Sequence, residues 1–378
     1  MAALTEEQAL IRDQAKSWAT SESPITKFRK LRDERIAHAF WPDHWQAMIE
    51  MGWTGILVPE EHGGSDLGYL TFGLILEELG RQLTASPLLA SGLVGASALR
   101  LGGTPEQQAE YLPRIVDGSA VFTLAVDEGP RHDPEKTALQ AAKDGNGFRL
   151  SGKKGFVLEG GAATHLLVAA RTAGSPGERA GITLFLVPAD AGGVSRSELV
   201  TADSRGYANV DLDGVAVGGD AVLGTVDDGF GLLDAILDRG RAGLGSEMLG
   251  TATAAFDMTV EYLKTRKQFG KAIGSFQALG HRAADMFTST EHARSCAEAA
   301  LAAIDAGADD VAAKVSLAKA KVGDHLHNVS RELIQMHGGI GMTDEYDAGF
   351  YLKRAQALEI IFGNQAFHRE RFARLMGY

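Results

Sequence analysis

The chain has 378 residues, more than one hydrophobic core usually holds, so two or three packed domains are expected. Its 37 Lys and Arg against 49 Asp and Glu give a net charge of −12, which argues against nucleic acid or an anionic membrane as the main partner. Cys296 is the single cysteine, which excludes an intrachain disulfide and favours a reducing compartment. No apolar run reaches the roughly 18 residues that span a bilayer, so we expect a cytoplasmic protein without a membrane partner.

Residues 1–118 are predicted to form an N-terminal helical domain. Thr5 is a candidate N-cap, and Gln8, three positions later, completes a capping box. A second start signal is Thr104 followed by Pro105 and Gln107, which supplies a cap, a proline at the first helical position and an acceptor at the third.

Residues 119–224 change to short apolar or alternating runs separated by turn residues. The clearest turn is the Asp-Gly-Asn-Gly run at 144–147, which directly precedes the run 148–150. Other runs lie at 166–170, 182–187 and 210–215. This middle region is predicted to be an antiparallel β domain, a small barrel or sandwich.

Residues 225–378 return to helical periodicity, and four long patterns predict a C-terminal four-helix bundle. In the first pattern, apolar residues recur at steps of four and three: Leu244, Met248, Thr251, Ala255, Met258 and Tyr262. The other three patterns cover about 276–306, 311–337 and 349–376. The expected fold class is therefore α+β multidomain, with domains at 1–118, 119–224 and 225–378.

Two motifs lie at the ends of these helical patterns, Arg266-Lys267-Gln268-Phe269-Gly270 and Gln335-Met336-His337-Gly338-Gly339-Ile340-Gly341. A dinucleotide cofactor needs a cation for its pyrophosphate, a flat apolar contact and closely approaching backbone. An arginine, a phenylalanine and a glycine pair supply those parts. The alternative interpretation is a solvated arginine at one helix end and a simple glycine stop at the other.

Together with the helical, β, helical order and the segment 262–277, these motifs resemble the acyl-CoA dehydrogenase family. The resemblance covers nearly the whole chain and implies FAD as cofactor and an acyl-CoA as substrate. It also implies that the flavin site is completed across a subunit interface, so that binding requires an oligomer. The FAD-binding residues implied by the resemblance are Arg266, Phe269, Gln277, Gln335, Gly338 and Gly339.

The resemblance fails at the catalytic base. Family members remove the α-proton with a glutamate, and Phe362 occupies that position here. The phenyl ring of Phe362 cannot accept a proton. Some relatives carry the glutamate before an arginine instead, but this chain has Gly240-Arg241 there. Arg241 matches the family's arginine near the acyl-CoA site. Glu247, seven residues after Gly240, is the best substitute base and Glu359 a weaker one, so no catalytic residue is assigned.

The middle region departs as well. The family's flavin-contacting Thr-Glu-Pro segment and its Gly-Ser-Asp continuation are replaced by residues 126–131, Val-Asp-Glu-Gly-Pro-Arg. Its Trp-Ile-Thr strand reads Phe156-Val157-Leu158, so the expected hydroxyls are missing although Phe156 keeps an aromatic ring. The departures gather at the reacting end of the flavin.

This pattern resembles the glutamate-lacking subunit of bacterial heteromeric acyl-CoA dehydrogenases of steroid side-chain degradation. This resemblance implies an α2β2 heterotetramer with a second, glutamate-bearing subunit, and a homo-oligomer is the alternative. Two further functions stay open: a self-sufficient dehydrogenase that uses Glu247, and a flavin monooxygenase or oxidase on the same fold. The eleven histidines show no metal-ligand spacing, and the acyl or steroid group is not predicted.

Overall fold

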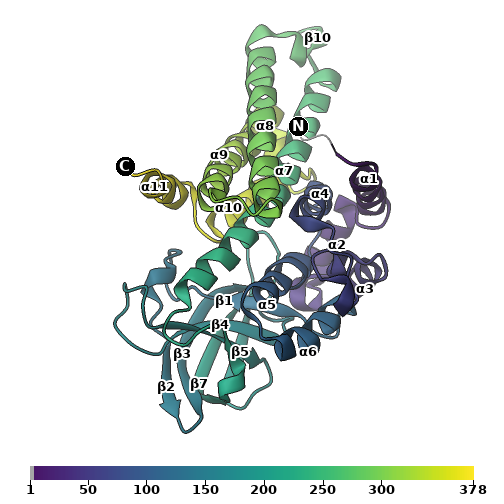
Figure 1. Cartoon of the computed structure of the whole chain (residues 1–378). Coiled ribbons are helices and arrows are strands. Elements are labelled where there is room, and N and C mark those ends of the chain that lie inside the picture. Colours follow the sequence, from purple (N-terminus) through teal and green to yellow (C-terminus); the bar gives the residue numbers. More distant parts are fainter. Residues whose placement is uncertain (1–3) are drawn as a thin grey trace. The chain divides into compact units, whose positions relative to one another are not determined.

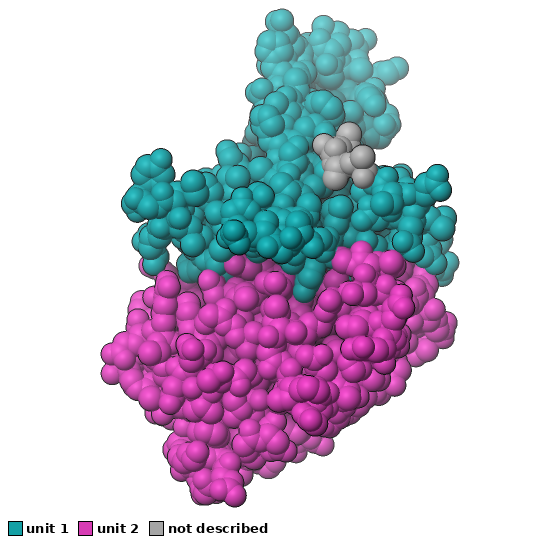
Figure 2. Space-filling model, in the orientation of Figure 1, with its two compact units in different colours: residues 1–30, 69–84, 241–378 teal, residues 31–68, 85–240 magenta. Residues whose placement is uncertain are grey.

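The computed structural model describes residues 4–378, which form two compact units, each assembled from separate stretches of the chain (Figure 2). One unit combines residues 1–30, 69–84 and 241–378, and the other combines residues 31–68 and 85–240. The expected N-terminal domain therefore contributes to both units. The division at residues 118 and 224 remains a prediction.

The unit that contains the C-terminus is helical (Figure 1). Its long helices are α7, which begins in the other unit, α8 and α9, and the N-terminal segments α1, α4 and the start of α2 belong to the same unit. The bounds are α1 Glu6–Ser21, α2 Ile25–Glu34, α4 Gly68–Arg81, α7 Phe230–Thr265, α8 Gln277–Asp305, α9 Val311–His337, α10 Ala348–Ile360 and α11 Gln365–Leu375.

Two glycines let helices α4 and α7 pack closely. A Cβ atom added at Gly80 would collide with the carbonyl of Glu247, and one added at Gly250 would collide with the carbonyl of Glu77. Each helix thus presents a glycine to the backbone of the other, a close approach that any side chain would prevent. This contact holds an N-terminal segment against the C-terminal bundle.

The predicted fourth helix at about 349–376 is two helices, α10 and α11, and this part of the prediction is wrong. The helix ends at Ile360 because Phe362 and Gly363 adopt φ angles of 55° and 104°, outside the helical region. Asn364 then caps α11 by accepting a hydrogen bond from the Phe367 amide at 3.0 Å. The interruption includes Phe362, the residue that the resemblance aligned with the catalytic glutamate.

The other unit is built on a sheet, with helices α3, α5 and α6 and a buried π-helix before α5. The helical bounds are α3 Pro42–Glu50, the π-helix Leu88–Gly95, α5 Ala96–Gly102 and α6 Pro105–Val116. The strands are β1 Phe122–Ala125, β2 Gln140–Asp144, β3 Gly147–Leu158, β4 His165–Arg171, β5 Ile182–Pro188, β6 Val194–Leu199, β7 Tyr207–Val217 and β8 Val222–Leu223.

The eight strands form one sheet in the order β6-β7-β3-β2-β4-β5-β8, with β1 added beside β4. Most neighbours are antiparallel, as predicted, while β1 and β2 each run parallel to β4. The predicted turn at 144–147 joins β2 and β3, where Asp144 pairs with Gly147. The predicted fold class, with helical, β and helical regions in that order, is confirmed.

Both predicted capping boxes are present. The Thr5 hydroxyl accepts from the Gln8 amide at 3.1 Å, and the Thr104 hydroxyl accepts from the Gln107 amide at 3.2 Å. The apolar stripe of α7 is buried from Leu244 to Ala255 and half-buried at Met258 and Tyr262. Local sequence rules therefore place these helices correctly.

Candidate functional site

The first motif forms a small hairpin at the end of the α7–α8 pair (Figure 1). Strands β9 (Lys267–Gln268) and β10 (Lys271–Ala272) pair antiparallel around Phe269 and Gly270, whose φ angles are 53° and 78°. Positive φ at both central residues is the geometry of a type I′ turn, which favours Asn-Gly rather than Phe-Gly. Phe269 is nevertheless 90% exposed and meets only the edge of the Phe276 ring, with centroids 6.0 Å apart.

Three polar side chains of the predicted site lie on the surface. Arg266 follows the last residue of α7, Gln277 begins α8, and Gln335 lies in the last turn of α9. Within residues 4–378, none of these three side chains has a hydrogen-bond or ion-pair partner. A guanidinium and two amides that the chain itself does not use are suitable donors for an external anion.

The second motif ends α9. Gly338 adopts φ 61° and ψ −137°, a conformation that only glycine adopts readily, and its amide donates to the carbonyls of Gln335 and Ile334. The Gly338 amide is therefore already used by the chain. A Cβ added at Gly339 would meet no atom within 4 Å, so the fold of this chain does not require glycine there. The missing side chain instead leaves clearance for something outside the chain.

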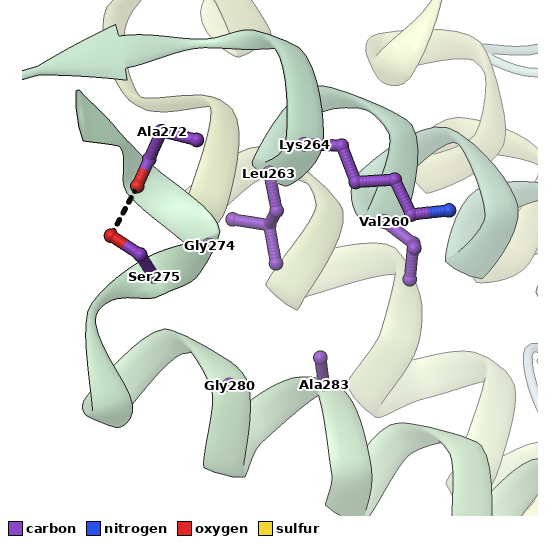
Figure 3. A pocket seen from close by; sticks show the side chains of 8 residues that line it. All are labelled: Val260, Leu263, Lys264, Ala272, Gly274, Ser275, Gly280 and Ala283. Carbon is purple, nitrogen blue, oxygen red and sulfur yellow. Dashed lines mark hydrogen bonds between the residues drawn. The ribbon is translucent and has the colours of Figure 1, made fainter.

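A cavity of about 410 Å³ lies beside the hairpin, between the end of α7 and the start of α8 (Figure 3). Figure 3 shows small or apolar residues around it, with the amine of Lys264 at one side. The Ser275 hydroxyl is not available to a ligand as a donor, because it donates to the carbonyl of Ala272 at 2.7 Å. The lining residues are Val260, Leu263, Lys264, Ala272, Gly274, Ser275, Gly280 and Ala283.

The turn at Phe362 is held by buried basic side chains. The Phe362 carbonyl accepts hydrogen bonds from Arg241 Nε and His368 Nε2, each at 3.1 Å. The Lys319 amine donates to the carbonyls of Leu358, Glu359 and Gly363 at 3.1–3.2 Å. The Phe362 side chain is only 7% exposed. A phenyl ring thus occupies a fixed, buried place in this turn.

Burial shapes the protonation of these basic groups. Desolvation, helped by the nearby Arg241 charge, lowers the pKa of Lys319 to about 7. Desolvation and the charges of Arg241 and Lys319 also lower the pKa of His368 far below its usual value. His368 is therefore neutral, and because a carbonyl only accepts, its Nε2 carries the proton.

The two substitute bases are engaged in ion pairs. Glu247 lies 3.6 Å from the Arg354 guanidinium, and the two side chains are 5% and 0% exposed. Glu359 Oε2 accepts from His327 Nδ1 at 3.0 Å and from Gln365 Nε2 at 3.1 Å. Each carboxylate is stabilised in its charged form by these contacts, which a proton on the carboxylate would weaken. This geometry argues against both residues as catalytic bases.

Arg241, the predicted substrate residue, is 1% exposed. Its guanidinium lies 5.4 Å from the centre of the Phe367 ring, in addition to its bond with the Phe362 carbonyl. Sequence reasoning missed Lys319, His368 and Arg354. Lys319 did leave a signal, because it interrupts an apolar stripe of α9 formed by Val315, Val322, Leu326, Val329 and Leu333.

In the other unit, the loop after β1 uses its charges internally. Asp127 pairs with His132 at 2.9 Å, and Glu128 accepts from the buried Lys154 amine at 2.6 Å. Glu128 also accepts from the amides of Ala138 and Leu139, which closes the loop. Desolvation lowers the pKa of Lys154. Asp127 and Glu128, which stand in the segment where the family's threonine is expected, therefore bind groups of this chain instead.

Phe156 lies at an irregularity of β3, where the pairing with β7 shifts between Lys154 and Val157. It adopts φ 53°, and its ring stacks on Tyr207 with centroids 4.2 Å apart and planes 15° apart. The ring is 38% exposed while Tyr207 is buried. Such an aromatic surface on a β-bulge fits a planar ligand.

Within residues 4–378, no group of three or more His, Cys, Asp or Glu side chains could hold a metal ion. None of the helices in the same part of the chain is both long and apolar enough to cross a bilayer.

Family models match three successive regions of the chain. "Acyl-CoA dehydrogenase, N-terminal domain" matches residues 5–119, "Acyl-CoA dehydrogenase, middle domain" residues 127–215, and "Acyl-CoA dehydrogenase, C-terminal domain" residues 227–377. Acryloyl-CoA reductase (NADH) of Anaerotignum propionicum is 30% identical over 98% of this chain and 94% of its own length. Mitochondrial isovaleryl-CoA dehydrogenase of Solanum tuberosum is 33% identical over 86% of this chain and 80% of its own.

Solved structures agree with these relatives. The Tcur3481–Tcur3483 steroid ACAD aligns with a TM-score of 0.88 and 32% identity, over 98% of this chain and 98% of that chain. The ChsE4–ChsE5 complex from Mycobacterium tuberculosis aligns with a TM-score of 0.90 and 27% identity, over 100% of both chains.

Proposed function

The chain belongs to the acyl-CoA dehydrogenase family, and from that premise we propose that it is an FAD-binding subunit without a base of its own. Its proposed role is to take part in the α,β-dehydrogenation of a CoA thioester in a heteromer. The partner is a homologous subunit that carries the glutamate, in an α2β2 assembly. We also propose the three domains 1–118, 119–224 and 225–378.

One contrast carries this proposal. Arg266, Gln277 and Gln335 face outward, and none of these three side chains has a hydrogen-bond or ion-pair partner among residues 4–378. At the base position, by contrast, stands the buried Phe362. Glu247 cannot easily replace the missing base, because its carboxylate is paired with the buried Arg354. The chain therefore offers a cofactor surface without a proton acceptor.

The residues present fit FAD. The site combines a guanidinium, two side-chain amides, an exposed ring and a glycine, Gly339, whose added Cβ would meet no atom of residues 4–378 within 4 Å. We assign Arg266 to the pyrophosphate, Phe269 to the adenine side, and the Gln277 and Gln335 amides to hydrogen bonds. Gly338 and Gly339 leave room for the cofactor. When bound, FAD supplies the acceptor for the hydride that leaves the β-carbon.

Arg241 is proposed as a residue of the acyl-CoA site that acts through its charge. Its side chain is buried against the Phe362 carbonyl, so it does not need to touch the thioester to make that place electropositive. A positive charge there favours the enolate-like charge that develops when the α-proton leaves. The proton itself passes to the partner subunit's carboxylate in this proposal.

The structural neighbours support a heteromer. Tcur3481–Tcur3483 and ChsE4–ChsE5 are each named as pairs of chains, and the first is named a steroid ACAD. By this analogy we propose a steroid-derived or similarly bulky acyl group as the substrate class.

The test is the absorbance spectrum of the chain purified alone and co-expressed with a glutamate-bearing homologue, each mixed anaerobically with a panel of acyl-CoA esters. We expect flavin binding and bleaching only in the co-expressed complex. Bleaching by the chain alone would instead establish a self-sufficient dehydrogenase. A flavin that no acyl-CoA bleaches but that consumes oxygen after chemical reduction would support the monooxygenase or oxidase alternative.

A further inference from the structure

Three aromatic side chains join the two segments of the proposed flavin site. Tyr262 lies in the last turn of α7, and its carbonyl accepts from the Arg266 amide at 2.9 Å. His337 is the last residue of α9 and directly precedes Gly338. Tyr346 lies in the loop between α9 and α10. One residue of this trio is thus attached to each motif, and the third lies beside both.

The contacts within the trio are close. The rings of Tyr262 and His337 stack with centroids 4.1 Å apart and planes 27° apart, and the Tyr262 hydroxyl donates to the His337 carbonyl at 3.4 Å. The rings of Tyr346 and His337 lie 4.7 Å apart. His337 is only 3% exposed, so it forms the centre of the trio.

Hydrogen bonds fix the orientation of the imidazole. His337 Nδ1 lies 2.7 Å from the Leu333 carbonyl, which only accepts, so Nδ1 carries the proton. Nε2 of the neutral ring then accepts from the Tyr346 hydroxyl at 3.1 Å. Burial lowers the pKa of His337, which favours this neutral form. Both ring nitrogens are satisfied in one orientation.

The loop that carries Tyr346 is anchored separately. The Arg29 guanidinium pairs with Asp347 at 2.6 Å and donates to the Asp344 carbonyl at 2.6 Å. The end of α7, the turn that follows the hairpin and the helix α9 share one apolar cluster that includes Leu263, Ile273 and Met336. The trio is therefore held from both sides and is not a mobile surface group.

We propose that Tyr262, His337 and Tyr346 are positioning residues that hold the hairpin and the Gly338–Gly339 turn as one preformed FAD half-site. This inference rests on the proposed function, because it assumes that both segments hold the same flavin. Arg266 lies one helical turn beyond Tyr262, and Gly338 is the residue after His337. A shift within the trio would change the spacing between the arginine and the glycine turn. Affinity gained through such preorganisation is lost when the spacing is free to vary.

The test measures FAD affinity in purified, flavin-loaded protein. Each variant is prepared in the form in which the wild type binds FAD, either alone or together with the partner subunit. His337→Phe keeps a ring for stacking but removes both imidazole hydrogen bonds, and Tyr262→Leu removes the stacked ring. We expect each variant to raise the dissociation constant for FAD about tenfold, measured by the fluorescence of released flavin. Tyr262→Phe keeps the ring and should stay within about threefold of the wild type.

Tyr351→Phe is the matched control. Tyr351 belongs to the same apolar cluster, but its hydroxyl donates to the Arg81 carbonyl at 2.9 Å, away from both motifs. We expect this variant to lower the melting temperature without changing FAD affinity. If His337→Phe and Tyr262→Leu lose stability but bind FAD like the wild type, the trio is only structural and the inference is overturned. A wild type that binds no FAD under any condition overturns the proposed function itself, and this inference with it.

Discussion

The hairpin at residues 266–272 connects α7 to α8, and the turn at residues 361–363 connects α10 to α11, yet their polar groups are used in opposite ways. At the hairpin, Arg266 and Phe269 face outward, and Phe269 is 90% exposed in a strained conformation. At the turn, basic side chains saturate the carbonyls of Phe362 and its neighbours, and Phe362 is buried. Exposed polar groups on a strained segment indicate that the hairpin binds a ligand. A buried turn whose carbonyls accept hydrogen bonds from this chain indicates that the turn serves the fold.

The proposal that the hairpin binds FAD is tested most strongly by removing its contacts with the cofactor. Arg266→Ala combined with Gly339→Val should abolish co-purifying FAD, because the charge partner and the clearance are lost together. The Gly349→Val variant is the control for the valine, since a Cβ there also meets no atom within 4 Å of this chain. Full flavin occupancy in the double variant, read from the visible absorbance, would show that the site lies elsewhere.

The saturated turn is tested by Lys319→Met. This change removes the amine that donates to three carbonyls, two of them in buried hydrogen bonds, and we expect it to lower the free energy of unfolding by about 3 kcal/mol. Lys314→Met on the same helix is the control, because Lys314 is part of an exposed ion pair with Asp310. Urea unfolding of both variants measures the difference. Equal stabilities would mean that the turn does not depend on the buried amine.

The contribution of Lys319 to the free energy of unfolding should depend on pH. The pKa of Lys319 is lowered to about 7 in the folded protein, so between pH 7 and its unfolded value near 10.5 the unfolded chain binds more protons. The contribution of Lys319 to the free energy of unfolding therefore rises with pH between about pH 7 and 10.5 and does not change with pH below about pH 7. The stability difference between wild type and Lys319→Met should grow by roughly 1 kcal/mol per pH unit between pH 7 and 9. A difference that stays constant would show that the amine remains charged.

Glu247→Gln tests whether the neighbourhood of Phe362 hides a base. Because the glutamine removes the negative charge that lies 3.6 Å from the buried Arg354 guanidinium, we expect the free energy of unfolding to fall by about 2 kcal/mol. Turnover per bound flavin in the assembly should not change. Glu261→Gln, an exposed change on the same helix, is the control for both readouts. A large loss of turnover at full flavin occupancy would restore Glu247 as a catalytic residue.

Local sequence signals predicted the helix starts and the places of the two motifs. Features that depend on contacts between distant parts of the sequence were not predicted. The capping boxes at Thr5 and Thr104 and the two motifs are local, and the structure places both motifs at helix ends. The break at Phe362 was not predicted, because the apolar pattern continues across Ile361 and Phe362, while Arg241 and Lys319, which hold the turn, are distant in sequence. The same holds for the Glu247–Arg354 pair, whose members lie on different helices. Burial of a charged residue depends on a partner that periodicity does not reveal.

The smallest expected effect concerns the strain in the hairpin. Phe269 adopts φ 53° at 90% exposure, so Phe269→Asn, which tolerates this conformation, should raise the stability of the chain by about 1 kcal/mol. The same change removes the ring and should weaken FAD binding. Phe269→Tyr is the control, since it keeps both the ring and the strain and should alter neither quantity. Opposite changes in unfolding free energy and FAD affinity would identify the strain as a feature kept for binding, whereas a parallel change in both would mean that the phenylalanine serves the fold of this chain.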